Sequence, residues 1–222
     1  MNFKTWFRKL STFVLTVFLS LTLFSLPAHA FVNQDYLQLK ATNECVKCNL
    51  SGVDLSDQDL YGSALREADL SNANLSGALL NEAKLMGANL TGANLSSASL
   101  LGTKLANADL TMADLSNAKL SNAEMFETSL SGATLTGGEL EYAIISDADL
   151  SSAIAENANF THAYLSGSNL SDADFNGASM ESVKLSGATL TGASFVDADL
   201  YNARMPNDTI YRGDVSQFGA SD

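Results

Sequence analysis

The chain has two cysteines, Cys45 and Cys48, in a Cys-x-x-Cys spacing that could form a disulfide, a redox-active dithiol or part of a zinc site. Zinc is disfavoured because two ligands are too few and no histidine lies beside them. A reactive dithiol is disfavoured because the repeat pattern directs Cys48 inward. We expect a short disulfide, since two cysteines of an exported protein usually pair and the N-terminus, described below, predicts export.

Histidines and acidic residues offer little further chemistry. His29 lies in the N-terminal leader, and His162 is expected to stand alone on an outward corner as a solvated side chain. Asp69, Asp109 and Asp149 share one column of the repeat with Asn49, Asn89 and Asn169, which leaves Ca²⁺ binding as an alternative. The alternation of Asp with Asn is explained more simply as a way of keeping the negatively charged carboxylates apart. With no Gly-rich phosphate loop and no Ser-His-Asp set, we predict a non-enzyme without cofactor or metal.

A five-residue repeat must position all of these side chains. From Leu50 to Met205 every fifth residue is large and apolar except Ala155, which gives 32 consecutive units. Leucine fills 24 of the central positions, and alanine fills 23 of the positions two residues earlier. Residues 73–77, Ala-Asn-Leu-Ser-Gly, are a typical unit. An internal repeat held over this length determines the architecture.

Neither regular secondary structure accommodates this period. Five residues rotate about 140° on an α-helix, so the leucines would spiral around it instead of forming a stripe. On a flat strand an odd step sends successive leucines to opposite faces. The chain must therefore turn once per unit, and four short extended segments with four turns make a square coil of about 20 residues. Stacked coils are spaced by about 4.8 Å, and each buries its leucines against its neighbours.

With this pattern the chain resembles the pentapeptide-repeat family over residues 48–205. The resemblance implies an all-β solenoid, a right-handed quadrilateral β-helix of about eight coils with a short helical N-terminal cap. Members of the family do unrelated jobs, so the resemblance predicts the fold and leaves the function open. The leader, cap and Cys-x-x-Cys arrangement is similar to that of exported cyanobacterial members, which implies the periplasm or the thylakoid lumen.

Residues 1–30 are predicted to be a cleaved signal peptide. Three basic residues precede an uncharged apolar run, and residues 28–30, Ala-His-Ala, provide a cleavage site before Phe31. Removing these three bases from the 12 in the chain leaves 9 against 25 acidic residues, a net charge of −16. Such a charge opposes binding to nucleic acid or anionic lipid. We expect no stable membrane association after cleavage.

The segments that flank the repeat are predicted to close its ends. Residues 31–47 form the N-terminal cap, in which Tyr36, Leu37 and Leu39 of a short helix face the first coil. Residues 206–222 form a C-terminal cap followed by a polar tail from Gly213 that we expect to be mobile. Within the repeat, Ala155 predicts a local bulge or bend, with Ile154 turned inward or nearby phenylalanines filling the space.

Sorting residues by a 20-residue coil gives two distinctive faces. The basic face comprises the units centred on Leu65 and every twentieth residue to Met205, and it holds five of the six bases of the repeat, Lys119 being the exception. The tyrosine face comprises the units centred on Leu60 and every twentieth residue to Leu200. It contributes Tyr61, Leu79, Leu101, Tyr142 and Tyr201. The candidate partner surface on these faces consists of Lys84, Met86, Lys104, Phe126, Tyr142, Ile144, Tyr164 and Lys184.

Three functions fit the sequence. The favoured one is an exported, non-enzymatic scaffold that binds a protein partner through the faces carrying Phe126, Ile144 and Tyr164. The second follows from the resemblance: some family members inhibit or protect a DNA topoisomerase by imitating DNA, which the signal peptide disfavours here. The third is calcium binding by the carboxylate column. The sequence predicts neither the identity of the partner nor an oligomeric state.

Overall fold

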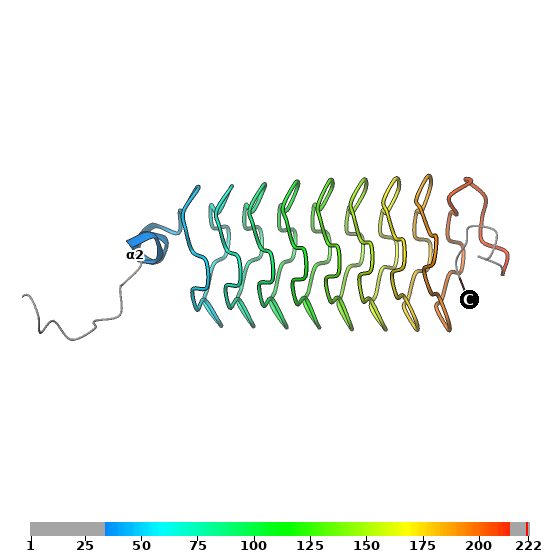
Figure 1. Ribbon diagram of the computed structural model, residues 1–222, viewed down its shortest axis with the longest axis horizontal. Helices are drawn as coiled ribbons and strands as arrows, with labels where there is room; N and C mark the ends of the chain where they lie inside the picture. The colour runs from blue at the N-terminus through cyan, green and yellow to red at the C-terminus, as the bar shows by residue number, and fades with distance from the viewer. Residues whose placement is uncertain (1–33, 214–220, 222) are drawn as a thin grey trace, which may run out of the picture. The chain divides into compact units, whose positions relative to one another are not determined.

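The computed structural model describes residues 34–213 and 221, and the predicted signal peptide lies outside these residues. Residues Asp35–Asp222 form one compact unit, in which successive coils stack along an axis (Figure 1). Between successive coils the paired residues form parallel bridges twenty positions apart, as Asn49 and Asp69 do. The column that begins at Glu44 makes eight such steps to Arg204, as the period predicts. The pairing consists of isolated single-residue bridges, so the extended segments are shorter than expected.

Each pentapeptide contains one tight turn followed by one paired residue. In the first unit the Val53 N–H donates to the Leu50 carbonyl at 3.1 Å, and the Asn49 side chain accepts from the Ser51 N–H at 3.1 Å. The third residue of the turn is left-handed, with φ of +65° at Gly52. Most units place Gly, Asn or Asp there, because these residues tolerate positive φ best.

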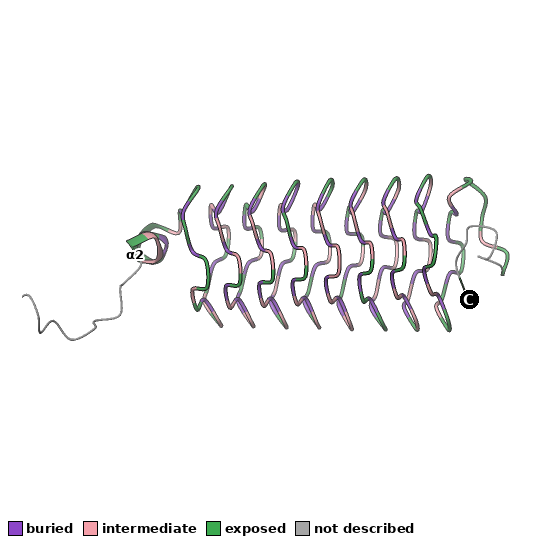
Figure 2. Cartoon of the chain, in the orientation of Figure 1, coloured by how far each residue is buried: buried purple, intermediate pink, exposed green. Residues whose placement is uncertain are grey.

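The central residue of each unit and the small residue two positions before it fill the inside of the coils. Buried and exposed residues alternate along every coil (Figure 2), and central residues such as Leu50 and Leu115 are fully buried. Where the small position holds Thr, the hydroxyl is also buried and bonds a backbone carbonyl. Thr103 Oγ1, for example, donates to the Leu80 carbonyl at 2.8 Å. The core is thus apolar, with its buried hydroxyls bonded to backbone in most cases.

The predicted bulge at Ala155 is absent, and that prediction is wrong. The Ala155 N–H donates to the Asp174 carbonyl at 2.7 Å, as in regular units. Ile154 does not turn inward, because it is 42% exposed and bridges to residues of both neighbouring coils. Phe175 lies one coil later on the same face, fully buried, with its ring centroid 5.5 Å from that of Phe160. The backbone stays regular, and we expect these large rings to supply the apolar volume that alanine lacks.

Helix α2, Gln34–Thr42, covers the first coil. Leu39 is buried in the common core and Tyr36 packs against it, whereas Leu37 is exposed, contrary to the prediction. The Asp35 carboxylate accepts a hydrogen bond from the Asn49 N–H at 2.7 Å, which satisfies a backbone donor at the open edge of the first coil. Cys45 and Cys48 then join in a disulfide that connects the end of the cap to the first unit.

After Met205 the chain turns back on the last coil. Arg204 and Ile210 form an antiparallel bridge, and the Tyr211 N–H donates to the Ala203 carbonyl at 2.9 Å. Tyr211 is partly buried against the core. These contacts cover part of the edge of the final coil, where unpaired backbone groups would otherwise be left. Among the described residues, no helix has the length and apolar character needed to cross a membrane.

Candidate binding surface

One column of bridges along the basic face contains five of the eight residues of the candidate partner surface. Its members from the second coil onward are Lys84, Lys104, Glu124, Ile144, Tyr164, Lys184 and Arg204. Paired neighbours in such a column are about 4.8 Å apart. Met86 and Phe126 follow central residues on the same face, and Tyr142 belongs to the adjoining tyrosine face. The fold therefore brings residues separated by 20 positions into one strip.

Large apolar side chains are concentrated on the same two faces. Eleven such residues are exposed in the repeat, and eight of them lie on the basic and tyrosine faces. They are Tyr61, Leu79, Leu101, Phe126, Tyr142, Ile144, Tyr164 and Tyr201. Phe126, Ile144 and Tyr164 occupy successive coils and are each about two-fifths exposed. The arrangement exposes apolar area at the middle of an otherwise polar solenoid.

An acidic side chain and an aromatic ring each contact one cation of this column. Lys104 Nζ lies 3.6 Å from a Glu124 carboxylate oxygen. Lys184 Nζ lies 4.1 Å from the centroid of the Tyr164 ring, within the range of a cation–π contact. The exposed ion pair contributes little to stability, but both contacts orient long side chains on this face.

The sequence suggested that His162 stands alone, but in the structure its ring has an aromatic neighbour. Its ring stacks on that of Tyr142, with centroids 5.0 Å apart and planes inclined by 24°. The two residues occupy the same left-handed turn position in successive coils, with φ of +60° and +58°. Coil stacking therefore aligns the two rings, and His162 belongs to the tyrosine face as an aromatic contact.

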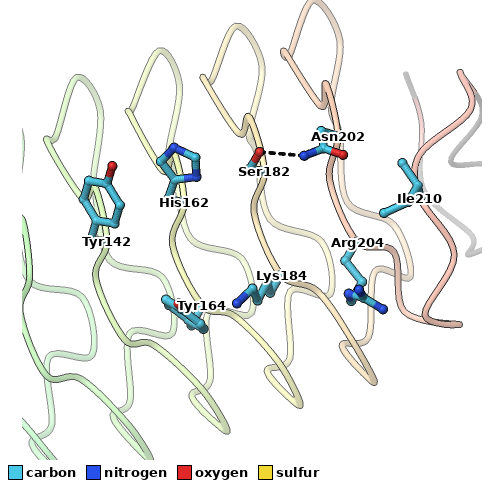
Figure 3. Close-up of a pocket in the computed structure, with 8 residues that line it drawn as sticks. All are labelled: Tyr142, His162, Tyr164, Ser182, Lys184, Asn202, Arg204 and Ile210. Carbon is cyan, nitrogen blue, oxygen red and sulfur yellow. Dashed lines mark hydrogen bonds between the residues drawn. The ribbon is translucent and has the colours of Figure 1, made fainter.

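A shallow groove of about 320 Å³ runs between the two faces toward the C-terminal end (Figure 3). One row along it contains Tyr142, His162, Ser182 and Asn202, and the other contains Tyr164, Lys184 and Arg204, with Ile210 at the end. The groove thus brings together three predicted surface residues, Tyr142, Tyr164 and Lys184. Lys84, Met86, Lys104, Phe126 and Ile144 do not line it. The predicted surface did not include the lining residues His162, Ser182, Asn202, Arg204 and Ile210, although the 20-residue period aligns the first four with predicted members.

The carboxylate column on a plain face is a hydrogen-bonded ladder. Asn89 Nδ2 donates to Asp69 Oδ1 at 3.2 Å, and Asn169 Nδ2 donates to Asp149 Oδ1 at 3.1 Å. Burial opposes ionisation of Asp109, but hydrogen bonds from the side chain and N–H of Thr111 outweigh it and lower the pKa. Within residues 34–213 and 221, no group of three or more His, Cys, Asp or Glu side chains is arranged to hold a metal ion.

These coils define a β-solenoid in which equivalent positions of successive coils share one face. The family model for pentapeptide repeats matches eight copies in residues 48–85, 83–122, 113–151, 143–181 and 178–207. The chain therefore belongs to the pentapeptide-repeat family, whose fold is the right-handed quadrilateral β-helix. Proteins of this family are generally non-enzymatic.

Solved structures of similar proteins include pentapeptide-repeat proteins from cyanobacteria and from a plant. HetL, a pentapeptide repeat protein involved in heterocyst differentiation regulation from Nostoc sp. strain PCC 7120, is 28% identical, with 79% of this chain and 98% of HetL covered and a TM-score of 0.27. The protein alr5209 from Nostoc PCC 7120 is 30% identical, with 59% and 88% covered and a TM-score of 0.35. AT2G44920 from the Arabidopsis thaliana thylakoid lumen is 24% identical, with 63% and 73% covered and a TM-score of 0.24. No curated protein matches this sequence.

Proposed function

We propose that this protein is an exported, non-enzymatic scaffold that binds a protein partner through the candidate partner surface. The observation that carries the proposal is the run of Phe126, Ile144 and Tyr164 on successive coils, with Tyr142 beside it. Protein interfaces are enriched in aromatic residues and Met and depend on a few large central side chains. Elsewhere the outward positions are mainly Ser, Thr, Asn, Asp and Gly, which provide few such anchors.

The rigid core supports a scaffolding role. Central residues on this face, such as Met125 and Ile145, are fully buried, while the backbone of each coil is bonded to the next. The outward side chains are therefore presented on a surface that needs little ordering on binding, which lowers the entropic cost of association. Neither Phe126 nor Ile144 is part of the inner layer, so either can change without opening the core.

Export to the periplasm or thylakoid lumen is the second part of the proposal. It rests on the predicted signal peptide and on the disulfide between Cys45 and Cys48. Disulfides form and persist in oxidising compartments, whereas cytosolic thiols are kept reduced. The pairing of both cysteines in the chain therefore suits an exported protein.

The test is capture of partners by immobilised protein from the envelope or lumen fraction of its own cells. Phe126→Ser combined with Ile144→Ser should abolish recovery of the main captured protein, because the central apolar anchors are gone. Asn89→Ser, on a plain face, is the matched control and should leave recovery unchanged. Circular dichroism should show that all variants keep the parent fold. Equal recovery by the double variant and the parent would contradict the proposal.

A further inference from the structure

We infer that the groove between the two faces binds a small organic anion, a carboxylate carried on a ring. This site does not depend on a protein partner. Its volume of about 320 Å³ is at the lower end of the range of small-molecule sites. Two cations of the groove, Lys184 and Arg204, are paired side by side in the ladder.

These two cations lack a carboxylate partner among the described residues. The salt bridges there join Lys47 to Glu67 and Lys104 to Glu124. The nearby Asp208 is engaged elsewhere: its Oδ1 accepts from Ser186 Oγ at 2.5 Å, and Arg204 reaches only its backbone carbonyl, at 3.4 Å.

The same column contains a second like-charged pair in a different setting. Lys84 and Lys104 also form a like-charged pair, and there Glu124 in the next coil supplies a negative charge. Next to Lys184 the corresponding neighbour is the neutral Tyr164. Like charges held side by side repel. In a chain with a formal net charge of −13, a cationic pair left without an acid is a place where a bound anion adds a favourable interaction.

The remaining lining suits the ring of such a ligand. The stacked rings of Tyr142 and His162 lie in the row facing the cations, and Tyr164 lies beside Lys184 (Figure 3). Asn202 Nδ2 donates to Ser182 Oγ at 3.0 Å, which leaves polar amide and hydroxyl groups on the same row. Flat apolar surface next to hydrogen-bonding groups and cations is suited to a sugar acid or an aromatic acid. Both share a carboxylate attached to a ring.

Calorimetric titration of the purified protein at low ionic strength tests this site with defined probes. Digalacturonate represents the sugar acids and benzoate the aromatic acids, and the dimethyl ester of digalacturonate is the uncharged control. At least one acid should bind with a dissociation constant below about 1 mM, and whichever binds identifies the source. If digalacturonate binds, its ester should bind about tenfold more weakly or not at all, because a charge-assisted hydrogen bond is lost.

Variants locate the binding to the groove. Lys184→Met and Arg204→Met should each weaken binding of the acid by about tenfold or more. Lys119→Met makes the same change of charge on another face and should leave the affinity within about twofold. The Phe126 and Ile144 substitutions lie outside the groove and should not affect it, so this result is separable from partner capture. Dissociation constants above about 1 mM for both acids, or equal losses in all three lysine and arginine variants, would overturn the inference.

Discussion

Replacing both Ala155 and Phe175 by leucine tests how the core tolerates its one small central residue. Both residues are fully buried on the same face of adjacent coils. The ring of Phe175 lies 5.5 Å from that of Phe160 and 5.3 Å from that of Phe195. An Ala and Phe pair has the same number of side-chain carbon atoms as a Leu and Leu pair. Ala155→Leu with Phe175→Leu therefore restores the usual repeat without changing the amount of buried hydrocarbon.

The single substitutions should both destabilise the fold. Phe175→Leu removes three buried carbon groups at about 0.8 kcal/mol each, a cost of about 2.4 kcal/mol. Ala155→Leu inserts three carbon groups into a space that is already filled, which costs about 1–3 kcal/mol. In the double variant the leucine that replaces Ala155 occupies the volume that the ring leaves. We expect its free energy of unfolding to exceed the additive value by about 2 kcal/mol.

Thermal unfolding followed by circular dichroism, with the disulfide intact, measures these effects. A coupling of about 2 kcal/mol corresponds to about 4–8 °C in Tm for a chain of this size. Leu115→Ala, two coils before Ala155 on the same face, should cost about 2–5 kcal/mol and act additively with Phe175→Leu. Strict additivity in the Ala155 and Phe175 double variant would refute the idea that the ring compensates for the alanine.

Three further predictions concern the N-terminus, the disulfide and one carboxylate. N-terminal sequencing of the native protein should begin at Phe31, and an uncleaved start would contradict export. Reduction of the bond between Cys45 and Cys48 should lower stability by about 2 kcal/mol, seen in thermal melts; alkylation of both without reductant would show that no bond exists. Because the pKa of Asp109 is lowered in the fold, its carboxylate stabilises the folded state above the ordinary aspartate pKa. This stabilisation is lost as pH falls through the lowered pKa. Between about pH 5 and about pH 2, the Tm of the Asp109→Asn variant should therefore fall by less than the Tm of the parent. An equal or larger fall would exclude a stabilising role of the Asp109 carboxylate.

The sequence predicted the coil and its inner layer because both follow from periodicity. A period of five with large apolar residues from Leu50 to Met205 allows one way to bury them, and the structure buries these positions. The response to Ala155 was not predictable in the same way. Whether a missing volume bends the backbone or is filled by rings depends on rotamers in neighbouring coils, which the period does not specify.

The binding surface was only partly predictable. Counting by 20 places Ile144 and Tyr164 on neighbouring coils of one face, as the ladder has them. It does not show that the rings of Tyr142 and His162 stack, because contact depends on side-chain torsions as well as on register. Ile210 joins the groove through an antiparallel turn beyond the repeat, where the frame no longer assigns positions.

Hydroxyl-radical footprinting of the protein with its captured partner tests the central claim most directly. Phe126, Ile144 and Tyr164 should be oxidised less when the partner is bound. The protected residues should therefore be spaced by about one coil along the sequence. Met112 lies on a plain face, is 67% exposed, and serves as the internal control with unchanged oxidation. Protection of Met112 equal to that of Phe126, or full oxidation of Phe126 and Tyr164 in the complex, would contradict partner binding through this surface.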